Sequence, residues 1–226
     1  MTSVGVIIPA RNEAEELPAT LARLCAIEPK LSVVMVDGGS TDATVAIARS
    51  AGAEVILSAV GCRGVQINLG IEACRADVAW VIHADTWVDA AHLASLRAAM
   101  ESNPRLLGGA FCRSFRSASP VLRWTCRMAA LRNHTLGWHL GDQAMFMRKT
   151  AWAGVGRFPE WSRFEDLEFS RRLGRAGVVA SLKPWVSTSA RRFERGGSVR
   201  VIVGDFFLTL QYLAGWEARR RLRSTQ

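Results

Sequence analysis

A fourfold alternation of short apolar runs and helical patterns in the first hundred residues constrains the fold most. Each run is followed by apolar residues at helical spacing, and the runs are "VGVII" (4–8), "LSVVMV" (31–36), "AEVIL" (53–57) and "VAWVI" (78–82). Repeated strand–helix units form a mostly parallel sheet with helices on both faces. Ligands bind such sheets at the carboxyl ends of the strands. We therefore expect an α/β fold with its site where these strands end.

The pattern changes after about residue 104. "LLGGAFCRSF" (106–115) predicts a strand, 119–136 a helix, "GDQAMFMRK" (141–149) a short strand, and "FEDLEFSRRLGRAG" (164–177) a helix that ends at Gly177. No low-complexity linker interrupts the chain. We expect a single domain over residues 1–226, with halves at 1–103 and 104–197 and an amphipathic basic helix over 198–226.

That last segment carries an apolar stripe followed by the basic tail "WEARRRLRSTQ". The stripe residues are Val199, Ile202, Val203, Phe206, Phe207, Leu210 and Leu213. The stripe fits packing against the sheet and also docking at a membrane interface, and both readings stay open. No apolar run reaches the roughly 18 residues of a membrane span, and the N-terminus lacks the features of a secretory signal. Five cysteines without a CxxC pair suit a reducing compartment. We expect a cytoplasmic protein, with peripheral contact at the inner face of the membrane as an option.

The net charge and the absence of several known motifs limit the classes of partner and cofactor that the protein is expected to bind. The net charge is +9 and comes mainly from arginine, which forms bidentate contacts with phosphates and carboxylates. No RNA-binding or DNA-binding signature accompanies the charge, so no nucleic acid partner is expected. No GxGxxG follows the first strand and no GxxxxGK[ST] occurs, which disfavours dinucleotide-dependent and P-loop enzymes.

Polar residues follow three of the predicted strands. The stretch "PARNEAEEL" follows the first, where Asn12 and Glu15 fit a helix capping pair. Asp37 follows the second strand, where a carboxylate can accept from a nucleobase N–H or a ribose hydroxyl. Asp85, in "WVIHADTWVD" after the fourth, either holds a divalent cation across two phosphates or ends a strand in an ordinary turn.

Three further stretches carry charge beside predicted turns or helix ends. Arg63 in "GCRGVQINLG" fits a ligand-facing loop or a surface position near a cap. Glu165 and Asp166 begin a helix, where they could include a general base or only complement the helix dipole. The arginines of "SARRFERGG" could neutralise a diphosphate or form a solvated basic turn.

Taken in order over nearly the whole chain, eight stretches resemble inverting family 2 glycosyltransferases with the GT-A fold, a Rossmann-like sheet flanked by helices. They are "VIIPARNEAEELPATL", "VVMVDGGSTDAT", "GCRGVQINLG", "VIHADT", "GGAF", "GDQAMFMRK", "FEDLEFSRRL" and "TSARRFERGG". The short length, "HADT" and "SARRFERGG" resemble a compact bacterial subgroup, some members of which are named arsenosugar-biosynthesis glycosyltransferases.

The resemblance implies a role for each motif. Residues 1–103 become the nucleotide-binding half, with a nucleoside site formed by Pro9, Ala10, Arg11, Glu13, Asp37, Arg63, His83 and Ala84. Residues 104–197 become the acceptor and catalytic half, where Asp166 is the general base with Glu165 beside it, and Asp142 and Gln143 bind the sugar or acceptor. The departing diphosphate is assigned to Arg191, Arg192 and Arg195. Asp85 would ligate the cation.

One departure from the family pattern affects the cation. The family usually carries Asp-x-Asp, and here His83 occupies the first position. An imidazole suits Mn²⁺ better than Mg²⁺, and His139 is a candidate additional ligand. The cofactor expected is therefore Mn²⁺ or Mg²⁺.

The predicted activity is metal-assisted transfer of a sugar from a nucleoside diphosphate sugar, by family expectation a UDP-sugar, to an acceptor hydroxyl. The acceptor is either lipid-linked or a small molecule. One alternative is a sugar-nucleotide nucleotidyltransferase, which would normally carry a Gly-rich basic loop that "PARNEAEEL" does not supply. The other is a non-catalytic basic module at a membrane surface.

Overall fold

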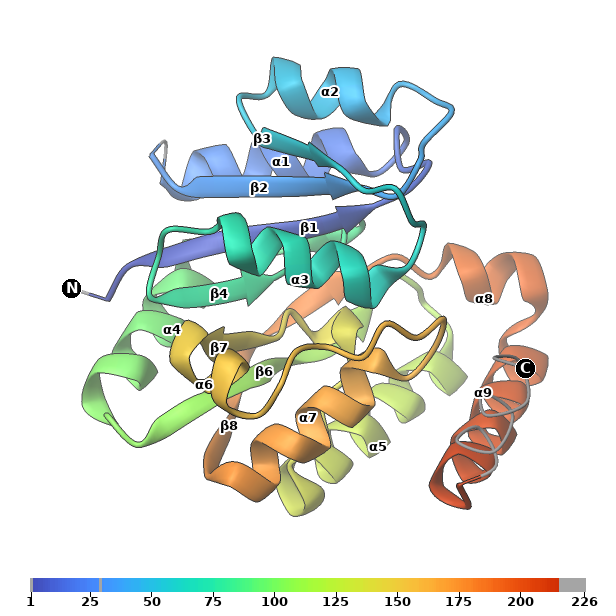
Figure 1. The fold of residues 1–226 in the computed structure, drawn as a ribbon. Coiled ribbons are helices and arrows are strands. Elements are labelled where there is room, and N and C mark those ends of the chain that lie inside the picture. The colour runs from blue at the N-terminus through green and yellow to red at the C-terminus, as the bar shows by residue number, and fades with distance from the viewer. Residues whose placement is uncertain (1, 29, 216–226) are drawn as a thin grey trace, which may run out of the picture.

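The computed structural model describes residues 2–28 and 30–215 as one sheet flanked by helices (Figure 1). The strands are β1 (Val4–Ala10), β2 (Ser32–Asp37), β3 (Glu54–Leu57), β4 (Val78–Val81), β5 (Thr86–Trp87), β6 (Leu106–Phe115), β7 (Phe146–Arg148) and β8 (Val178–Thr188). The helices are α1 (Leu17–Ile27), α2 (Thr44–Ser50), α3 (Arg63–Ala73), α4 (Ala90–Ser102), α5 (Pro120–Leu136), α6 (Lys149–Gly154), α7 (Glu165–Ala176), α8 (Arg191–Gly196) and α9 (Ser198–Leu213), with a 3₁₀ turn, η1 (Gly141–Gln143).

The sheet has the strand order β3-β2-β1-β4-β7-β6-β8-β5. The four predicted strands of the first half pair in parallel. β7 lies antiparallel between β4 and β6, β8 runs parallel to β6, and β5 closes the edge antiparallel to β8. The predicted α/β fold class is therefore confirmed, with a sheet that is mixed in its second half.

Two apolar layers cover the two faces of this sheet. Along β1, Val6 and Ile8 point into the cluster that packs under α1, α2 and α4, whereas Ile7 points into the cluster under α3, α6 and α7. This alternation follows from the two-residue period of a strand. All three side chains are fully buried, so the central strands are held rigidly and their carboxyl ends have fixed positions.

In the second half of the chain, the observed helices match the predicted ones, whereas the observed strands match the prediction less well. β6, α5 and α7 lie where the patterns predict them, and Gly177 is the residue that ends α7. β8 is a strand that the sequence pattern did not reveal, because Lys183 and Pro184 interrupt its apolar residues. The predicted strand over 141–149 is reduced to β7, preceded by η1.

The position of α9 contradicts the interpretation that the C-terminal stripe packs against the sheet. In Figure 1, α8 and α9 lie at the side of the molecule, away from the body of the sheet. Six stripe residues keep between 41% and 63% of their surface exposed, namely Val199, Val203, Phe206, Phe207, Leu210 and Leu213. The stripe therefore does not pack against the sheet. Within residues 2–28 and 30–215 no helix is both long and apolar enough to cross a membrane. The predicted basic tail, residues 216–226, lies outside the described residues.

Candidate active site

A pocket of about 700 Å³ lies beyond the carboxyl ends of β1 and β4, bounded by α5, α8 and α9. It gathers most of the residues that the sequence assigned to a site. Those that line it are Pro9, Glu13, Arg63, His83, Ala84, Asp85, Asp142, Asp166, Arg191 and Arg192. Several of the residues assigned to a nucleotide, an acceptor or a metal do not line it, namely Ala10, Arg11, Asp37, Gln143 and His139. Arg195 and Glu165 also lie outside its lining.

The loops that follow β1 and β2 are joined side by side. Ser40 Oγ accepts from the Asn12 N–H at 2.9 Å, and Asn12 Oδ1 accepts from the Thr41 N–H at 2.8 Å. Asn12 has a φ of 54°, so it turns the chain rather than capping α1, and its expected pairing with Glu15 is wrong. The two loops therefore form one rigid edge next to the pocket.

Asp37 belongs to this edge. Its carboxylate accepts from the N–H groups of Gly39 and Ser40, each at 3.0 Å, and from the Ser40 hydroxyl. Asp37 is buried and pairs in register with Ala10 of β1. Arg11 is exposed, and its Nη1 lies 2.8 Å from where a Cβ on Gly61 would be. These three residues shape the edge rather than the pocket.

β4 delivers His83 and Asp85 into the pocket. The Asp85 carboxylate lies 3.4 Å from Thr188 Oγ1 and 3.9 Å from Arg191 Nη2. Burial raises the pKa of Asp85, which is the behaviour of an acid without enough positive charge nearby. Burial, assisted by Arg63, lowers the pKa of His83 to about 4, so its ring is neutral at pH 7. His83 Nε2 is buried and has no hydrogen-bond partner among the described residues.

His83 and Asp85 are two side chains of the pocket that could ligate a metal ion. The described residues contain no group of three or more His, Cys, Asp or Glu side chains arranged around an ion. A neutral imidazole and one carboxylate fit a Mn²⁺ or Mg²⁺ ion that takes its other ligands from phosphate oxygens and water. His139 does not join them, because it is buried with its Nε2 3.0 Å from Ser181 Oγ and outside the pocket lining.

Asp166 and Glu165, adjacent in the sequence, have different surroundings. Asp166 lines the pocket, and its Oδ2 accepts from the Gly141 N–H at 2.6 Å. Glu165 is buried with its carboxylate 3.2 Å from Arg63 Nη1. Burial, and then the neighbouring Asp166, raise the pKa of Glu165. Asp166 can therefore meet a ligand, whereas Glu165 holds Arg63.

The three arginines of "SARRFERGG" separate along α8. Arg191 pairs with Glu13 and faces Asp85, and Arg192 lies 2.5 Å from Asp205 at the pocket rim. Arg195 is 75% exposed and its nearest acid, Glu15, is 3.9 Å away. Only the first two reach the pocket.

Sequence reasoning missed two arginines of the pocket. Arg113, from β6, forms an ion pair with Asp142, and this guanidinium lowers the pKa of Asp142 against the effect of burial. Arg132, from α5, donates to Gln143 Oε1 at 3.3 Å, which places Gln143 behind the pocket wall. The spacing of Trp124, Met128 and Arg132 on one helix face was the signal available for Arg132.

The family profile described as Glycosyl transferase family 2 matches residues 5–164. An uncharacterized glycosyltransferase of Mycobacterium tuberculosis is 35% identical over 107 residues, which are 47% of this chain and 48% of that protein. An undecaprenyl-phosphate 4-deoxy-4-formamido-L-arabinose transferase of Pseudomonas fluorescens is 31% identical over 147 residues, 57% of this chain and 40% of that protein. The chain thus matches about half the length of these curated relatives or less.

Solved structures share the fold at low identity. S. aureus TarS residues 1–349 superpose with a TM-score of 0.68 at 16% identity, covering 83% of this chain and 60% of that one. A mannosyltransferase of Pyrobaculum calidifontis, in complex with GDP-Man and Mn²⁺, has a TM-score of 0.66 at 18% identity, covering 83% and 56%. The arsenosugar subgroup stays a prediction. With the family match over most of its length, the chain belongs to glycosyltransferase family 2 and has the GT-A fold.

Proposed function

We propose that the protein is an inverting glycosyltransferase that moves a sugar from a UDP-sugar to an acceptor hydroxyl, with Asp166 as the general base. The observation that carries this proposal is the placement of Asp166 and Asp85 in the lining of the same pocket. Solved relatives support the donor, since TarS is described in complex with UDP-GlcNAc, and a glucosyl-3-phosphoglycerate synthase in complex with Mn²⁺ and UDP.

Asp166 is held ready for proton transfer. The Gly141 N–H at Oδ2 and the Leu167 N–H at Oδ1, each at 2.6 Å, fix the carboxylate. Each carboxylate oxygen keeps a second lone pair for the proton of the acceptor hydroxyl. As that proton moves to Asp166, the acceptor oxygen bonds to the anomeric carbon. The bond from that carbon to the phosphate oxygen breaks on the opposite face and its electron pair leaves with the nucleoside diphosphate, which inverts the anomeric centre.

The leaving group would bind in the same pocket, at Asp85 and His83. Asp85, with His83 beside it, would hold a divalent cation, which supplies positive charge to the departing diphosphate when bound. Arg191 already lies 3.9 Å from Asp85 and pairs with Glu13. Binding a diphosphate there gives Arg191 a third anionic partner, so this guanidinium can stabilise the negative charge that develops on the leaving group.

Binding and turnover test separate parts of this proposal. Thermal shifts with UDP, GDP, CDP, dTDP and ADP, each with Mn²⁺, Mg²⁺ or EDTA, identify the nucleotide, because a ligand of the folded state raises the melting temperature. We expect a metal-dependent shift with UDP that disappears in Asp85→Ala. No shift with any diphosphate, or an equal shift in EDTA, would contradict the metal–diphosphate site.

Asp166→Asn tests the base. We expect transfer to fall by about 10²–10⁴-fold, the range for losing a general base, while the UDP shift remains. Asp77→Asn is the matched control, because Asp77 is exposed and bonds Ser3 at the other end of β4. Normal turnover in Asp166→Asn would rule out this base, and release of pyrophosphate in place of nucleoside diphosphate would indicate a nucleotidyltransferase.

A further inference from the structure

Stripes on two helices, α5 and α9, form part of the pocket lining. On α5, Trp124, Met128 and Arg132 follow one another at four-residue spacing and all line the pocket. On α9, Ile202 and Phe206 line it at the same spacing. Residues four apart lie on one face of a helix, so each helix presents a continuous strip to the pocket.

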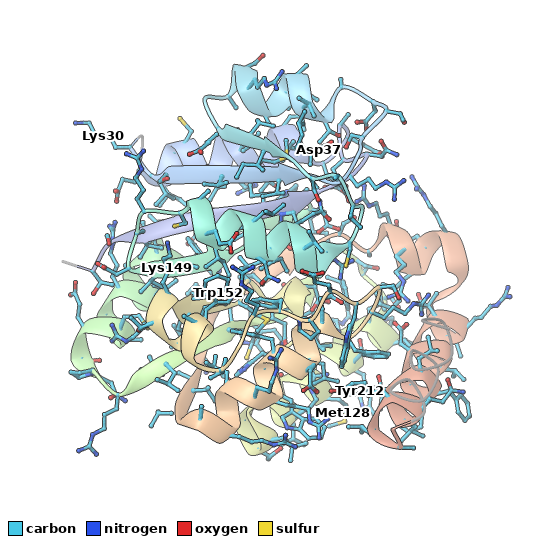
Figure 2. All side chains as sticks on the ribbon, in the orientation of Figure 1. Lys30, Asp37, Met128, Lys149, Trp152 and Tyr212 are labelled. Atoms are coloured by element: carbon cyan, nitrogen blue, oxygen red, sulfur yellow. The ribbon has the colours of Figure 1, made fainter. Side chains whose placement is uncertain are left out.

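The outer part of both strips is apolar and open to solvent. Trp124 is 59% exposed, Met128 39% and Phe206 60%. Figure 2 labels Met128 in the lower part of the molecule, on the side where α9 lies. Large apolar side chains that gather at the mouth of a pocket are typical of a surface that a ligand or partner covers.

The inner part of the α5 strip ends in a cation without a counter-ion. Arg132 donates to the Trp138 carbonyl at 3.2 Å and to the side-chain oxygens of Asn133 and Gln143 at 3.0 and 3.3 Å. All three acceptors are neutral. The other pocket arginines, Arg63, Arg113, Arg191 and Arg192, each have a carboxylate within ion-pair distance, and among the described residues Arg132 has none.

Arg132, which has no counter-ion among the described residues, lies near Asp142 and Asp166 on the acceptor side of the pocket. Burial and the neighbouring Arg113 lower the pKa of Arg132 to about 10, even with Asp142 and Asp166 close enough to oppose the effect. Arg132 is partly buried, and a charge removed from water without a charged partner is unfavourable. An anion bound here would remove that cost, and it would lie near the carboxylate proposed as the base.

We propose that this part of the pocket binds an anionic amphiphile as the acceptor, with its anionic group on Arg132, its reacting hydroxyl toward Asp166 and its apolar chain between the strips of α5 and α9. Charge complementarity at Arg132 selects the anionic group. The exposed Trp124, Met128 and Phe206 select the chain, and their position at the mouth lets the chain continue into a lipid layer. The proposal rests on the proposed function only in naming this ligand the acceptor.

Calorimetric titration of the full chain with octyl phosphate, 1-octanol and inorganic phosphate tests both parts without any nucleotide. We expect octyl phosphate to bind about 100-fold more tightly than inorganic phosphate, since several methylene groups leave water. It should also bind about tenfold more tightly than 1-octanol, since one charge-assisted contact forms. Arg132→Gln should weaken octyl phosphate by about tenfold and leave 1-octanol unchanged. Phe206→Ser should weaken both alkyl ligands.

Matched controls lie away from the pocket. Arg49→Gln, on exposed α2, and Leu57→Ser, a 63% exposed apolar residue of β3, should change neither affinity. Arg132→Lys guards against misfolding of the glutamine variant, because it keeps the charge and should retain part of the preference for octyl phosphate.

Three results would overturn the proposal. The anion site would be ruled out if octyl phosphate and 1-octanol bound with equal affinity. It would also be ruled out if Arg132→Gln left the affinity for octyl phosphate unchanged. Binding of inorganic phosphate as tight as octyl phosphate, and dependent on Arg132, would indicate a soluble anionic acceptor instead of an amphiphile. Because no nucleotide is present, these outcomes are distinguishable from a failed thermal shift with the nucleoside diphosphates, which would concern the proposed transferase alone.

Discussion

Removing the charge of Arg113 should destabilise the protein and make its stability respond to pH in a new way. The Arg113 and Asp142 side chains form an ion pair and are only 10% and 27% exposed. Asp142 Oδ1 is buried without another partner among the described residues. Arg113→Met keeps an unbranched stem but removes the guanidinium, so the Asp142 carboxylate stays in the pocket wall without this partner.

The size of the effect follows from the burial of the pair. Breaking a buried ion pair by removing one partner costs roughly 3–5 kcal/mol, and the residual exposure of Asp142 puts our expectation near the lower end, about 3 kcal/mol at pH 7. Arg157→Met is the matched control. Its pair with Glu72 is 58% and 38% exposed, so the loss should stay below about 1 kcal/mol.

The pH dependence gives the sharper test. In the wild type Arg113 lowers the pKa of Asp142, so the ionised carboxylate stabilises the fold above its unfolded pKa near 4 and this contribution is lost in acid. In Arg113→Met burial raises that pKa, and only the smaller effects of His83 and Arg132 oppose it. The carboxylate then destabilises the fold at neutral pH, and protonation relieves the cost as the pH falls.

Urea unfolding at pH 7 and pH 4.5 measures both quantities. We expect the difference in the free energy of unfolding between wild type and Arg113→Met to shrink on acidification. Adding Asp142→Leu should recover much of the loss at pH 7, because no unpaired charge remains. A cost at pH 7 no greater than that of Arg157→Met, or one that is equal at both pH values, would refute the reasoning.

Three further changes have expected outcomes. Gly141→Ala should lower turnover by roughly 10–100-fold, because a Cβ there would lie 2.8 Å from His83 Nε2 and 3.2 Å from Asp166 Oδ2 and disturb the charge-assisted hydrogen bond to Asp166; steady-state kinetics check this. Burial lowers the pKa of His139 to about 4, so stability should fall as the pH drops below 6.5. In urea unfolding, His139→Gln should reduce by about 2 kcal/mol the free energy of unfolding that is lost between pH 7 and pH 5. The control His134→Gln, at an exposed position, should not reduce this loss. Gln66 Nε2 donates to the carbonyls of Ala10 in β1 and Val36 in β2, each at 2.8 Å, and Gln66→Leu should cost about 2 kcal/mol in the same assay because both carbonyls lose a buried partner.

The first half of the fold was predictable because its signals are local and repeated. Each apolar run and the helix after it were read from periodicity. The rule that ligands bind at carboxyl strand ends then selected Asp85, Arg11 and Asp37, and of these Asp85 lines the pocket whereas Arg11 and Asp37 do not. Local reading failed where a side chain bonds outside its own segment. Asparagine is a residue type that often caps helices, yet Asn12 bonds to Thr41 in the loop after β2.

The acceptor side was less accessible because its parts come from distant segments. Arg113 lies on β6, whereas Asp142 belongs to η1 and Arg132 to α5. Nothing in the local sequence says that Arg113 has a carboxylate partner and Arg132 has none. That difference depends on how three elements meet in space, and it is the feature that points to the chemistry of the acceptor.

The C-terminal stripe illustrates the same limit in another way. A helix with one apolar face has the same period whether that face packs on a sheet, on a lipid layer or on a ligand. The sequence therefore predicts α9 but not its partner. The structure removes the sheet from the choice, since Phe206 and Phe207 remain 60% and 58% exposed. Phe206 also lines the pocket that contains Asp166. The apolar face thus begins inside the site and continues to the surface, as an acceptor with an apolar chain requires.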